Sequence, residues 1–356
     1  MLISTPVDIT AEWLTERLAQ QGVLQRGVVT QIEIGEQSSR RGTFGNTTSL
    51  AVTYSLDTTG PVPRQLFLKI SKAHLHPEVL ALGAREVGFY DAMQGHAEGL
   101  PIPRCYDSVY DAESGHSHIL IDDLSSTHVQ PAYPLPPAPE QCAGIMWSLA
   151  QLHAHWWNST RIARELSHLC DINTATATRL RLEATLPSFL HTLGDALLPA
   201  QQHVYHAILS SSLLARREAR LQSLAQVTLN HGDAHAWSFM LPRSVEGGPV
   251  LVIDWQLWEM ALPTDDLAYF MALWWTAGRR AALERTLVET YYRHLLARGV
   301  GNYDWDACWR DYRESVAYIT LVPIGQFRRK APLSVLWNGL ENSMAAFHDL
   351  QCADLL

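Results

Sequence analysis

The sequence of 356 residues predicts an α+β fold in two lobes, a first lobe that is mostly β-sheet and a second that is mostly helical. The length exceeds one domain of about 150 residues and is short for three. Strand-like runs fill the chain as far as Ile121, and helical periodicity dominates after Asp123. Hydrophobic residues make up 47% of the chain, which is enough for a large core. We therefore expect one domain over residues 1–122 and another over residues 123–356, without an internal repeat.

The first lobe is expected to be a sheet of about five strands with one inserted helix. The strand candidates are rich in β-branched and large apolar residues, lie between Gly or Pro clusters, and span Val28–Ile34, Thr48–Leu56, Gln65–Ser71, Arg104–Tyr110 and His118–Ile121. A helix with Asp8 or Thr10 as its N-cap precedes them over residues 8–22. Apolar residues at spacings of three and four predict the inserted helix over residues 77–94.

The second lobe begins after a proline-rich loop, Pro131–Pro139. Helical periodicity is found over residues 140–157, 177–190, 200–224, 264–275, 280–298 and 304–320. Gly299 lies where a helix C-terminal cap belongs. Two short apolar pieces, Gln226–Leu229 and Val250–Ile253, have strand character.

Composition excludes several classes of function. The formal charge is -9, which argues against a general nucleic-acid binder because such binding depends on clustered cations. The five cysteines form no C-x-x-C pair, and the first 20 residues do not resemble a signal peptide. The most apolar run, Leu267–Trp275, is far shorter than the roughly 20 residues that span a bilayer. We expect a cytoplasmic protein, monomeric or homodimeric, that binds neither nucleic acid nor a membrane.

A lysine within an apolar strand is the first candidate site residue. The chain has only three lysines and no G-x-x-x-x-G-K-[ST] loop, so a nucleotide enzyme would have to use one of these three. Lys69 follows Leu66–Leu68, and a charged ammonium at such a position needs an anionic partner. Glu86 on the following helix is the natural candidate, as in the Lys–Glu pair of protein kinases. The alternative is that Lys69 and Glu86 are both simply exposed to solvent.

Two later segments carry carboxylates between apolar residues. In the first, His231 and His235 flank Asp233 in a loop that ends near Ser238. In the second, Asp254 ends the apolar run that begins at Val250. Each could be a capping residue, and Asp254 could instead bind a hard cation such as Mg²⁺. A strand lysine, a helix glutamate, an H-G-D loop and then a strand-end aspartate form the order of parts that phosphoryl transfer requires.

The chain resembles the aminoglycoside phosphotransferase/choline kinase superfamily, and most closely its ecdysteroid-kinase-like branch. Six motifs carry the resemblance in the same order as in the family: R-E-x-x-F-Y at Arg85–Tyr90, L-E-D-L at Ile121–Leu124, L-A-x-L-H-A at Leu149–Ala154, H-G-D-x-H-x-x-N at His231–Ser238, I-D-[WF]-[EQ] at Ile253–Gln256 and D-L-A at Asp266–Ala268. The match is collinear from about residue 12 to residue 275, and it implies a protein-kinase-like two-lobed fold.

The resemblance also implies a role for each matched residue in an ATP- and Mg²⁺-dependent kinase of a small-molecule alcohol, with GTP as the alternative nucleotide. Asp233 would be the catalytic base, braced by His231, and Asp254 the main Mg²⁺ ligand. The nucleotide would be held by Lys69 and Glu86 at its phosphates, by the backbone of residues 120–124, including Asp122 and Leu124, at its base, and by a loop with Gly42 and Gly45 over the phosphates.

The sequence departs from the family at one ligand position. Ser238 stands where the family has Asn as a second metal ligand, and a hydroxyl can coordinate Mg²⁺ with a shorter reach. Weaker metal binding with retained activity would explain the change. A catalytically lapsed kinase fold that acts as a nucleotide-binding or scaffold module would explain it too.

Aromatic residues near the catalytic loop indicate how an acceptor could be bound. Trp237 and His235 lie in that loop and are the candidate acceptor contacts. Aromatic side chains suit a sugar, a sterol-like or polyketide alcohol or another natural product, or a quaternary ammonium. The net acidity is compatible with a cationic antibiotic. The sequence does not distinguish antibiotic inactivation from natural-product modification.

Overall fold

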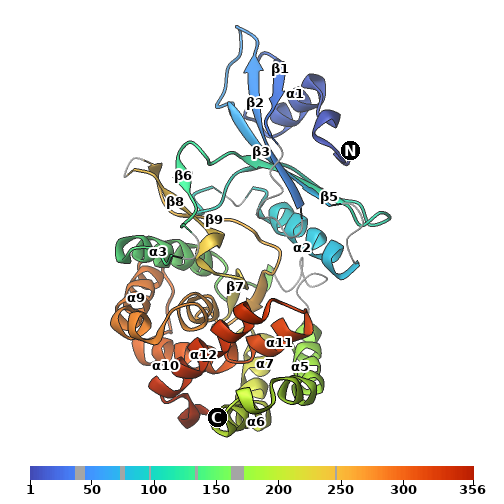
Figure 1. Ribbon diagram of the computed structural model, residues 1–356. Coiled ribbons are helices and arrows are strands. Elements are labelled where there is room, and N and C mark those ends of the chain that lie inside the picture. The colour runs from blue at the N-terminus through green and yellow to red at the C-terminus, as the bar shows by residue number, and fades with distance from the viewer. Residues whose placement is uncertain (37–44, 73–76, 96–97, 133–134, 162–171, 245–246) are drawn as a thin grey trace. The chain divides into compact units, whose positions relative to one another are not determined.

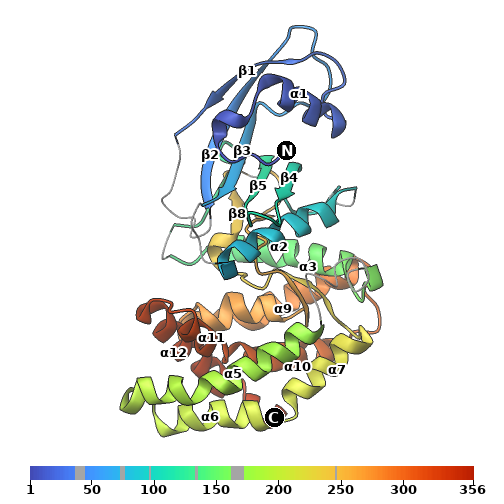
Figure 2. The ribbon, with the colours of Figure 1, turned by 90° about the vertical axis from the view of Figure 1, so that its right-hand side faces the viewer.

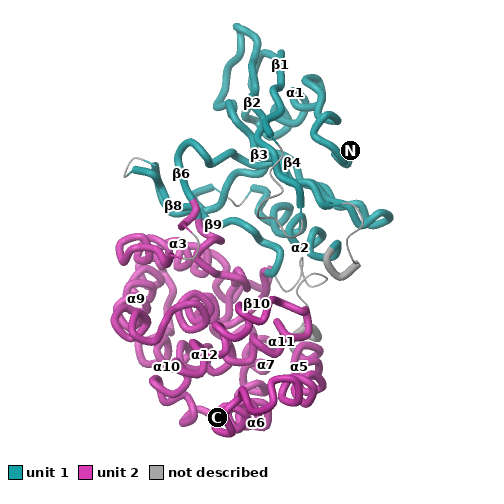
Figure 3. The backbone as a smooth tube through the Cα atoms, in the orientation of Figure 1, with its two compact units in different colours: residues 1–129, 240–257 teal, residues 130–239, 258–356 magenta. Residues whose placement is uncertain are grey.

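The computed structural model contains the whole chain and describes all residues except 37–44, 73–76, 96–97, 133–134, 162–171 and 245–246 (Figure 1). The chain divides into two compact units, residues 1–129 with 240–257 and residues 130–239 with 258–356 (Figure 3). The predicted α+β fold is confirmed, because the first unit is built on an antiparallel sheet and the second is mostly helical.

The first unit contains the five-stranded sheet that the sequence predicts. Its strands are β1 (Val29–Ile34), β2 (Gly45–Tyr54), β3 (Gln65–Ser71), β4 (Cys105–Tyr110) and β5 (Ser117–Asp122). They lie in the order β1-β2-β3-β5-β4, and every neighbouring pair is antiparallel. In the register of the central strands, Lys69 of β3 lies opposite Thr47 of β2 and Ile119 of β5.

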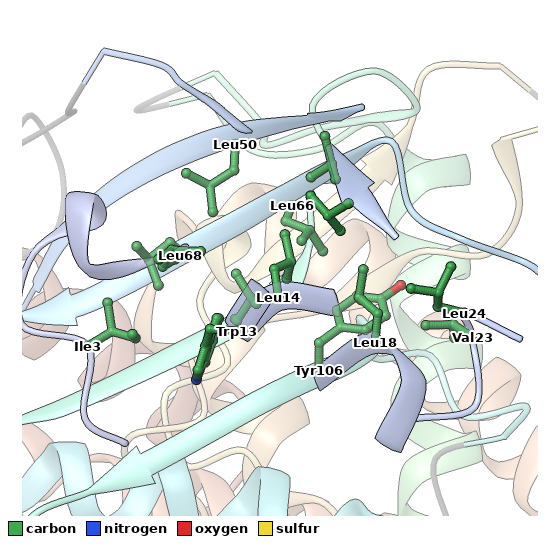
Figure 4. Packing of buried hydrophobic residues seen from close by; sticks show 14 of the residues in the cluster. Ile3, Trp13, Leu14, Leu18, Val23, Leu24, Leu50, Leu66, Leu68 and Tyr106 are labelled. Carbon is green, nitrogen blue, oxygen red and sulfur yellow. The ribbon is translucent and has the colours of Figure 1, made fainter. Parts of the chain in front are cut away.

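One face of this sheet is covered by helix α1 (Ala11–Gln20). Thr10 is its N-cap, since the threonine hydroxyl accepts a hydrogen bond from Trp13 N at 3.1 Å. Leu14 and Leu18 are fully buried and pack with residues of the strands, as Figure 4 shows. Alternate residues of β3 join the same core, namely Leu66, Leu68 and Ile70. The residues between them, including Lys69, therefore face the opposite side of the sheet.

Helix α2 (Pro77–Met93) packs against β4 and β5, on the side of the sheet that Lys69 faces. Gly83 makes the close approach possible, because a Cβ at this position would lie 2.5 Å from Ser117 Oγ. The helix that the sequence places between the third and fourth strands is thus confirmed, within one residue at its C-terminal end.

The first unit does not end at residue 122, where the sequence analysis placed the domain boundary. It continues to Val129 and also includes residues 240–257. The physical reason is a small sheet in which β6 (His128–Val129) pairs antiparallel with β8 (Phe239–Pro242), with β9 (Leu251–Val252) beyond β8. Hydrogen bonds across this sheet return Asp254 and its neighbours to the first unit.

The second unit is built from helices that Figure 2 shows from the side. Its longer helices are α3 (Pro139–His155), α5 (Ile172–Leu193), α6 (Pro199–Ser210), α7 (Leu213–Ser223), α9 (Ala277–Ala297), α10 (Trp305–Ile319), α11 (Val322–Arg328) and α12 (Leu333–Asp349). α3 packs along α9, and the short strands β7 (Thr228–Asn230) and β10 (Glu259–Ala261) pair with each other. Gly299 follows α9 with φ +86°, as expected for a C-terminal cap.

Two expectations for the second unit differ from the structure. The pattern over residues 200–224 is two helices, because the chain is extended at Ser211 between α6 and α7. The pattern over residues 264–275 is the short helix α8 (Asp265–Ala268), which leads directly into a π-helical turn, Tyr269–Leu273. No helix within the described residues is both long enough and apolar enough to cross a membrane.

Candidate active site

Lys69 is held between two carboxylates within the first unit. Its Nζ lies 2.9 Å from both Glu86 Oε1 and Glu86 Oε2, and 2.7 Å from Asp254 Oδ1. The Lys69 and Glu86 side chains are 17% and 6% exposed, whereas Asp254 is 50% exposed. The strand lysine and the helix glutamate are therefore a bidentate ion pair and not two separate surface charges.

Electrostatics keep this lysine charged. Burial by itself lowers the pKa of Lys69, but the carboxylates of Asp254 and Glu86 more than offset it and raise the pKa well above its ordinary value. Burial raises the pKa of Glu86, and the Lys69 ammonium opposes that shift. A third partner, Gln256, donates from Nε2 to Glu86 Oε2 at 3.1 Å. Gln256 belongs to the I-D-[WF]-[EQ] motif, and the resemblance implied no role for it.

Asp254 follows β9 in a backbone conformation that few residues adopt. Its φ is +72°, a value that aspartate tolerates better than most residues do. The next residue fixes this turn, because the Trp255 ring stacks on Phe89 of α2 at 3.8 Å between centroids and its Nε1 donates to Val252 O at 3.1 Å. Packing on α2 thus presents the half-exposed Asp254 carboxylate to Lys69.

The glycine loop predicted over the phosphates is described only at its end. Gly42 lies outside the described residues. Gly45 is the first residue of β2, and a Cβ there would lie 2.9 Å from Ile70 O and 3.3 Å from Lys69 Cγ. The absence of a side chain at Gly45 is therefore what lets β2 pass closely over the base of the Lys69 side chain.

A cavity of about 660 Å³ lies in the first unit, where the sheet meets the segment predicted to receive the base. It is lined by Glu33, Ala51, Val52, Thr53, Pro63, Arg64, Gln65, Asp122, Asp123, Leu124, Ser126 and Thr127. Its size is in the range of small-molecule and cofactor sites. The Asp122 carboxylate already accepts hydrogen bonds from Arg104 N at 3.1 Å and Tyr106 Oη at 2.7 Å, so that side chain is engaged within the sheet.

The predicted catalytic loop, residues 231–238, belongs to the second unit and is held by Asp266. Both oxygens of this buried carboxylate accept backbone bonds, Oδ2 from His231 N at 2.7 Å and Oδ1 from Gly232 N at 3.0 Å. His153 of α3 lies 3.2 Å from Asp266 Oδ2 through Nε2, and its Nδ1 lies 2.7 Å from Tyr291 Oη. Burial alone would raise the pKa of Asp266, but these contacts hold it below its ordinary value.

Three of the family's motifs thus meet at one point. The D-L-A aspartate and the L-A-x-L-H-A histidine support the loop that carries the H-G-D sequence. Asp266 and His153 belong to motifs that carry the resemblance, but no function was predicted for either residue. Their contacts join residues 34 or more positions apart, which no local pattern reveals.

Asp233 is fixed through both its backbone and its side chain. Its N–H donates to His231 Nδ1 at 3.2 Å, and the bracing role that the resemblance implies for His231 stays a prediction. Its carboxylate is 31% exposed, accepts a hydrogen bond from Tyr269 Oη on Oδ1 at 2.5 Å, and has Oδ2 3.6 Å from His235 Nε2. Tyr269 was not anticipated, because its position in the sequence gives no signal of this contact.

Ser238 is buried, and its hydroxyl is used within the loop. Oγ donates to Asp233 O at 2.8 Å and lies 3.0 Å from His235 Nδ1. Because the hydroxyl has a single proton, it faces His235 as an acceptor, and this assigns a proton to Nδ1. The role of Ser238 as a metal ligand stays a prediction, and the described contacts favour a brace for the loop.

The predicted acceptor contacts lie in one aromatic cluster. The His235 and Trp237 ring centroids are 5.4 Å apart, and Trp274 is 5.9 Å from His235 and 5.5 Å from Trp237 in edge-to-face geometry. The Trp237 backbone carbonyl accepts a bond from Gln130 Nε2 at 2.7 Å. The structure therefore brings Trp237 and His235 together near Asp233, and their contact with an acceptor stays a prediction.

The antiparallel sheet with its Lys–Glu ion pair, and the helical unit with its braced H-G-D loop, are the parts of a small-molecule kinase. The model of the ecdysteroid kinase-like family matches residues 85–298. The chain belongs to the ecdysteroid kinase-like family, which confirms the resemblance seen in its motifs. A comparison with curated protein sequences found no match.

Solved structures share the fold over nearly the whole chain. The GDP complex of wild-type aminoglycoside 2′-phosphotransferase-IIIa has a TM-score of 0.55 at 11% identity, with 96% of this chain and 99% of that chain covered. Choline kinase from Cryptosporidium parvum Iowa II has a TM-score of 0.52 at 10% identity, with coverages of 91% and 89%. The GDP and kanamycin complex of APH(2″)-IIia has a TM-score of 0.52 at 12% identity, with coverages of 96% and 99%.

Proposed function

We propose that this protein transfers the γ-phosphate of ATP, with GTP as the alternative donor, to a hydroxyl group of a small molecule in a Mg²⁺-dependent reaction. The observation that carries the proposal is the position of Lys69, a charged lysine held by the carboxylates of Glu86 and Asp254. In kinases such a lysine binds the nucleotide phosphates. The GDP complexes of the structural relatives support nucleotide binding at this fold.

The residues of the first unit fit the donor side of the reaction. Lys69, oriented by Glu86, would bind phosphate oxygens, and the cavity beside residues 122–127 would take the base. Asp254 is a half-exposed carboxylate of the kind that Mg²⁺ uses when phosphates complete its coordination. Bound Mg²⁺ would neutralise charge on the β- and γ-phosphates. A Mg²⁺ ion bound by one carboxylate and by phosphate oxygens does not need a closed cage of protein ligands.

Asp233 fits the acceptor side. In the transfer, the bond between the γ-phosphorus and the β,γ-bridging oxygen breaks, and a bond from the acceptor oxygen to that phosphorus forms. The nucleoside diphosphate leaves with the bond's electron pair, and the hydroxyl proton passes to the Asp233 carboxylate. The aromatic cluster of His235, Trp237 and Trp274 would pack against the acceptor. A sugar, a sterol-like alcohol, another natural product or an antibiotic such as an aminoglycoside fits these contacts equally.

The test combines nucleotide binding with a search for the acceptor. The midpoint temperature of thermal unfolding should rise when Mg²⁺ and ATP are added, because a ligand that binds only the folded state stabilises it. A panel of hydroxylated metabolites and antibiotics, incubated with the protein and ATP, should yield one product heavier by one phosphate. Lys69→Ala should remove the thermal shift, whereas Arg26→Ala, which breaks an exposed ion pair with Asp57, should retain it.

Asp233→Asn separates an active kinase from a lapsed one. It should lower turnover by several orders of magnitude, on the order of 10³-fold, and leave the ATP-induced thermal shift unchanged. A thermal shift in the wild type without any phosphorylated product or ATP hydrolysis would indicate a nucleotide-binding module instead. Absence of any nucleotide effect would contradict the proposal as a whole.

A further inference from the structure

Tyr269 reaches the carboxylate of Asp233 from a segment that already supports the catalytic loop. It is the first residue of the π-helical turn Tyr269–Leu273, three residues after Asp266. Its hydroxyl lies 2.5 Å from Asp233 Oδ1, the closest side-chain contact to that carboxylate among the described residues. π-Helical turns are rare and are found frequently at functional sites.

The direction of this hydrogen bond follows from the environment of the hydroxyl. Burial, together with the charge of Asp233, holds the pKa of Tyr269 well above its ordinary value. The hydroxyl therefore stays protonated and donates a hydrogen bond to the carboxylate. A donor of this kind stabilises an ionised carboxylate and restricts its rotation, which is otherwise broad for an aspartate.

The two carboxylate oxygens of Asp233 thus have different surroundings. Oδ1 is taken by Tyr269, and Oδ2 faces the His235 ring at 3.6 Å from Nε2, within the aromatic cluster. The Asp233 backbone is held separately from its side chain, because its carbonyl accepts hydrogen bonds from His235 N and Ser238 Oγ, both at 2.8 Å. Residues 266–269 therefore hold the loop at two places. Asp266 binds the amides of His231 and Gly232, and Tyr269 binds the carboxylate of Asp233.

We propose that Tyr269 is a positioning residue for the catalytic base: it holds Asp233 Oδ1 and leaves Oδ2 as the atom that accepts the proton of the acceptor hydroxyl. This inference rests on the proposed kinase function. Tyr269 acts only through Asp233, so removing its hydroxyl should slow the chemical step and leave nucleotide binding unchanged.

The experiment compares Tyr269→Phe with a matched control, Tyr303→Phe. Tyr303 is also a buried tyrosine of the second unit, and its hydroxyl donates to Asp311 Oδ2 at 2.9 Å. Both changes delete one hydroxyl bonded to a carboxylate. The assay is turnover of Mg²⁺-ATP with water as the acceptor. Tyr269→Phe should lower kcat by about tenfold or more with the KM for ATP within about twofold, whereas Tyr303→Phe should change neither.

A double mutant identifies the route by which Tyr269 acts. In an Asp233→Asn background, Tyr269→Phe should cause almost no further loss of turnover, since the base on which it acts is already absent. Losses that multiply, or a Tyr269→Phe enzyme with wild-type kcat, would overturn the inference and leave the kinase function standing. A wild-type protein without ATP turnover would overturn the kinase function and the inference together.

Discussion

At the scale of single residues, the site depends on carboxylates whose partners differ. Glu86 is buried, and Lys69 and Gln256 supply the hydrogen bonds and the counter-charge that its carboxylate needs there. Asp254 is half exposed and contacts the same lysine. In the proposed kinase, the glutamate would orient the lysine, and the half-exposed aspartate would be the carboxylate available to a cation. This difference in burial separates two roles that the sequence could assign only by resemblance.

Lys69 and Glu86 should behave as one unit in mutagenesis. Lys69→Ala should weaken ATP use by removing the phosphate contact, and Glu86→Ala should do so by releasing the ammonium. Because each acts through the other, the double mutant should lose little more than the worse single mutant. The measurement is kcat/KM for ATP in all four proteins. Fully additive losses would mean that the 2.9 Å contacts carry no function.

Ser238→Ala distinguishes two roles of the residue at which the chain departs from its family. Ser238 could be a metal ligand, or its hydroxyl could hold the loop by hydrogen bonds. The buried hydroxyl bonds to Asp233 O, so its loss should lower the free energy of unfolding by about 1–2 kcal/mol. The Mg²⁺ concentration for half-maximal rate should stay unchanged. A clear rise of that concentration, without loss of stability, would instead restore Ser238 as a metal ligand.

At the scale of elements, the D-L-A segment is the support on which the catalytic loop is built. α8 places Asp266 where both of its oxygens bind loop amides, and the π-helical turn places Tyr269 against Asp233. Helix α3 contributes His153 to the same carboxylate. Two elements far apart in the sequence therefore determine the shape of a loop that belongs to neither.

The pH dependence of stability should report on Asp266. Its pKa is lower in the folded state than the ordinary value of 3.8. A group with a depressed folded pKa stabilises the fold fully above its unfolded pKa, and this contribution is lost as the pH falls through the folded pKa. Wild-type stability should therefore drop steeply below about pH 4. Asp266→Asn should be less stable at pH 7, by about 3 kcal/mol, with a shallower acid dependence.

Urea unfolding at several pH values between 3 and 7 measures both effects. Asp57→Asn, which changes an exposed aspartate of the first unit, is the control and should follow the wild-type curve. If the free energy of unfolding of the wild type and of Asp266→Asn fell equally with pH, the contacts of Asp266 would not stabilise its ionised carboxylate.

At the scale of the whole molecule, the sequence predicted what local patterns determine. Alternating apolar residues such as Leu66, Leu68 and Ile70 gave the sheet, and helical spacing gave α1, α2 and α3. The break at Ser211 was missed although serine favours helix ends: the Ser211 hydroxyl donates to Ile208 O at 2.8 Å and accepts from Leu213 N at 3.2 Å, which ends α6 and begins α7. The return of residues 240–257 to the first unit was missed because strand pairing over long separations has no local signal.

The candidate site divides in the same way. Residue types and motif order singled out Lys69, Glu86, Asp233 and Asp254, which are the residue types that phosphoryl transfer requires. Tyr269 and Gln256 remained without a role because tyrosine and glutamine are found in many environments. Their function lies in the one carboxylate that each contacts, and that contact exists only after the chain has folded.

The last eighty residues matched no motif, yet they supply part of the second unit's core. In α12, Leu336, Leu340 and Phe347 are buried. The same helix contributes Asp349, which pairs with the fully buried Arg280 of α9. Arg280 also binds Glu284 at 2.7 Å, and Glu284 accepts a bond from Tyr312 of α10 at 3.2 Å. A charge network around the buried Arg280 therefore joins three helices, and two of them, α10 and α12, lie beyond the residues that the family model matches.

Arg280→Ala should accordingly be among the most destabilising single changes in the second unit. Removing one partner leaves the Glu284 carboxylate buried without its counter-charge, which costs about 3–5 kcal/mol of unfolding free energy. Arg285→Ala is the matched control, since Arg285 and Glu289 form the same i,i+4 pair on α9 with side chains 60% and 45% exposed. An exposed pair of this kind contributes about 0.3–0.5 kcal/mol. Equal losses in urea unfolding would show that α12 is held by its apolar face alone.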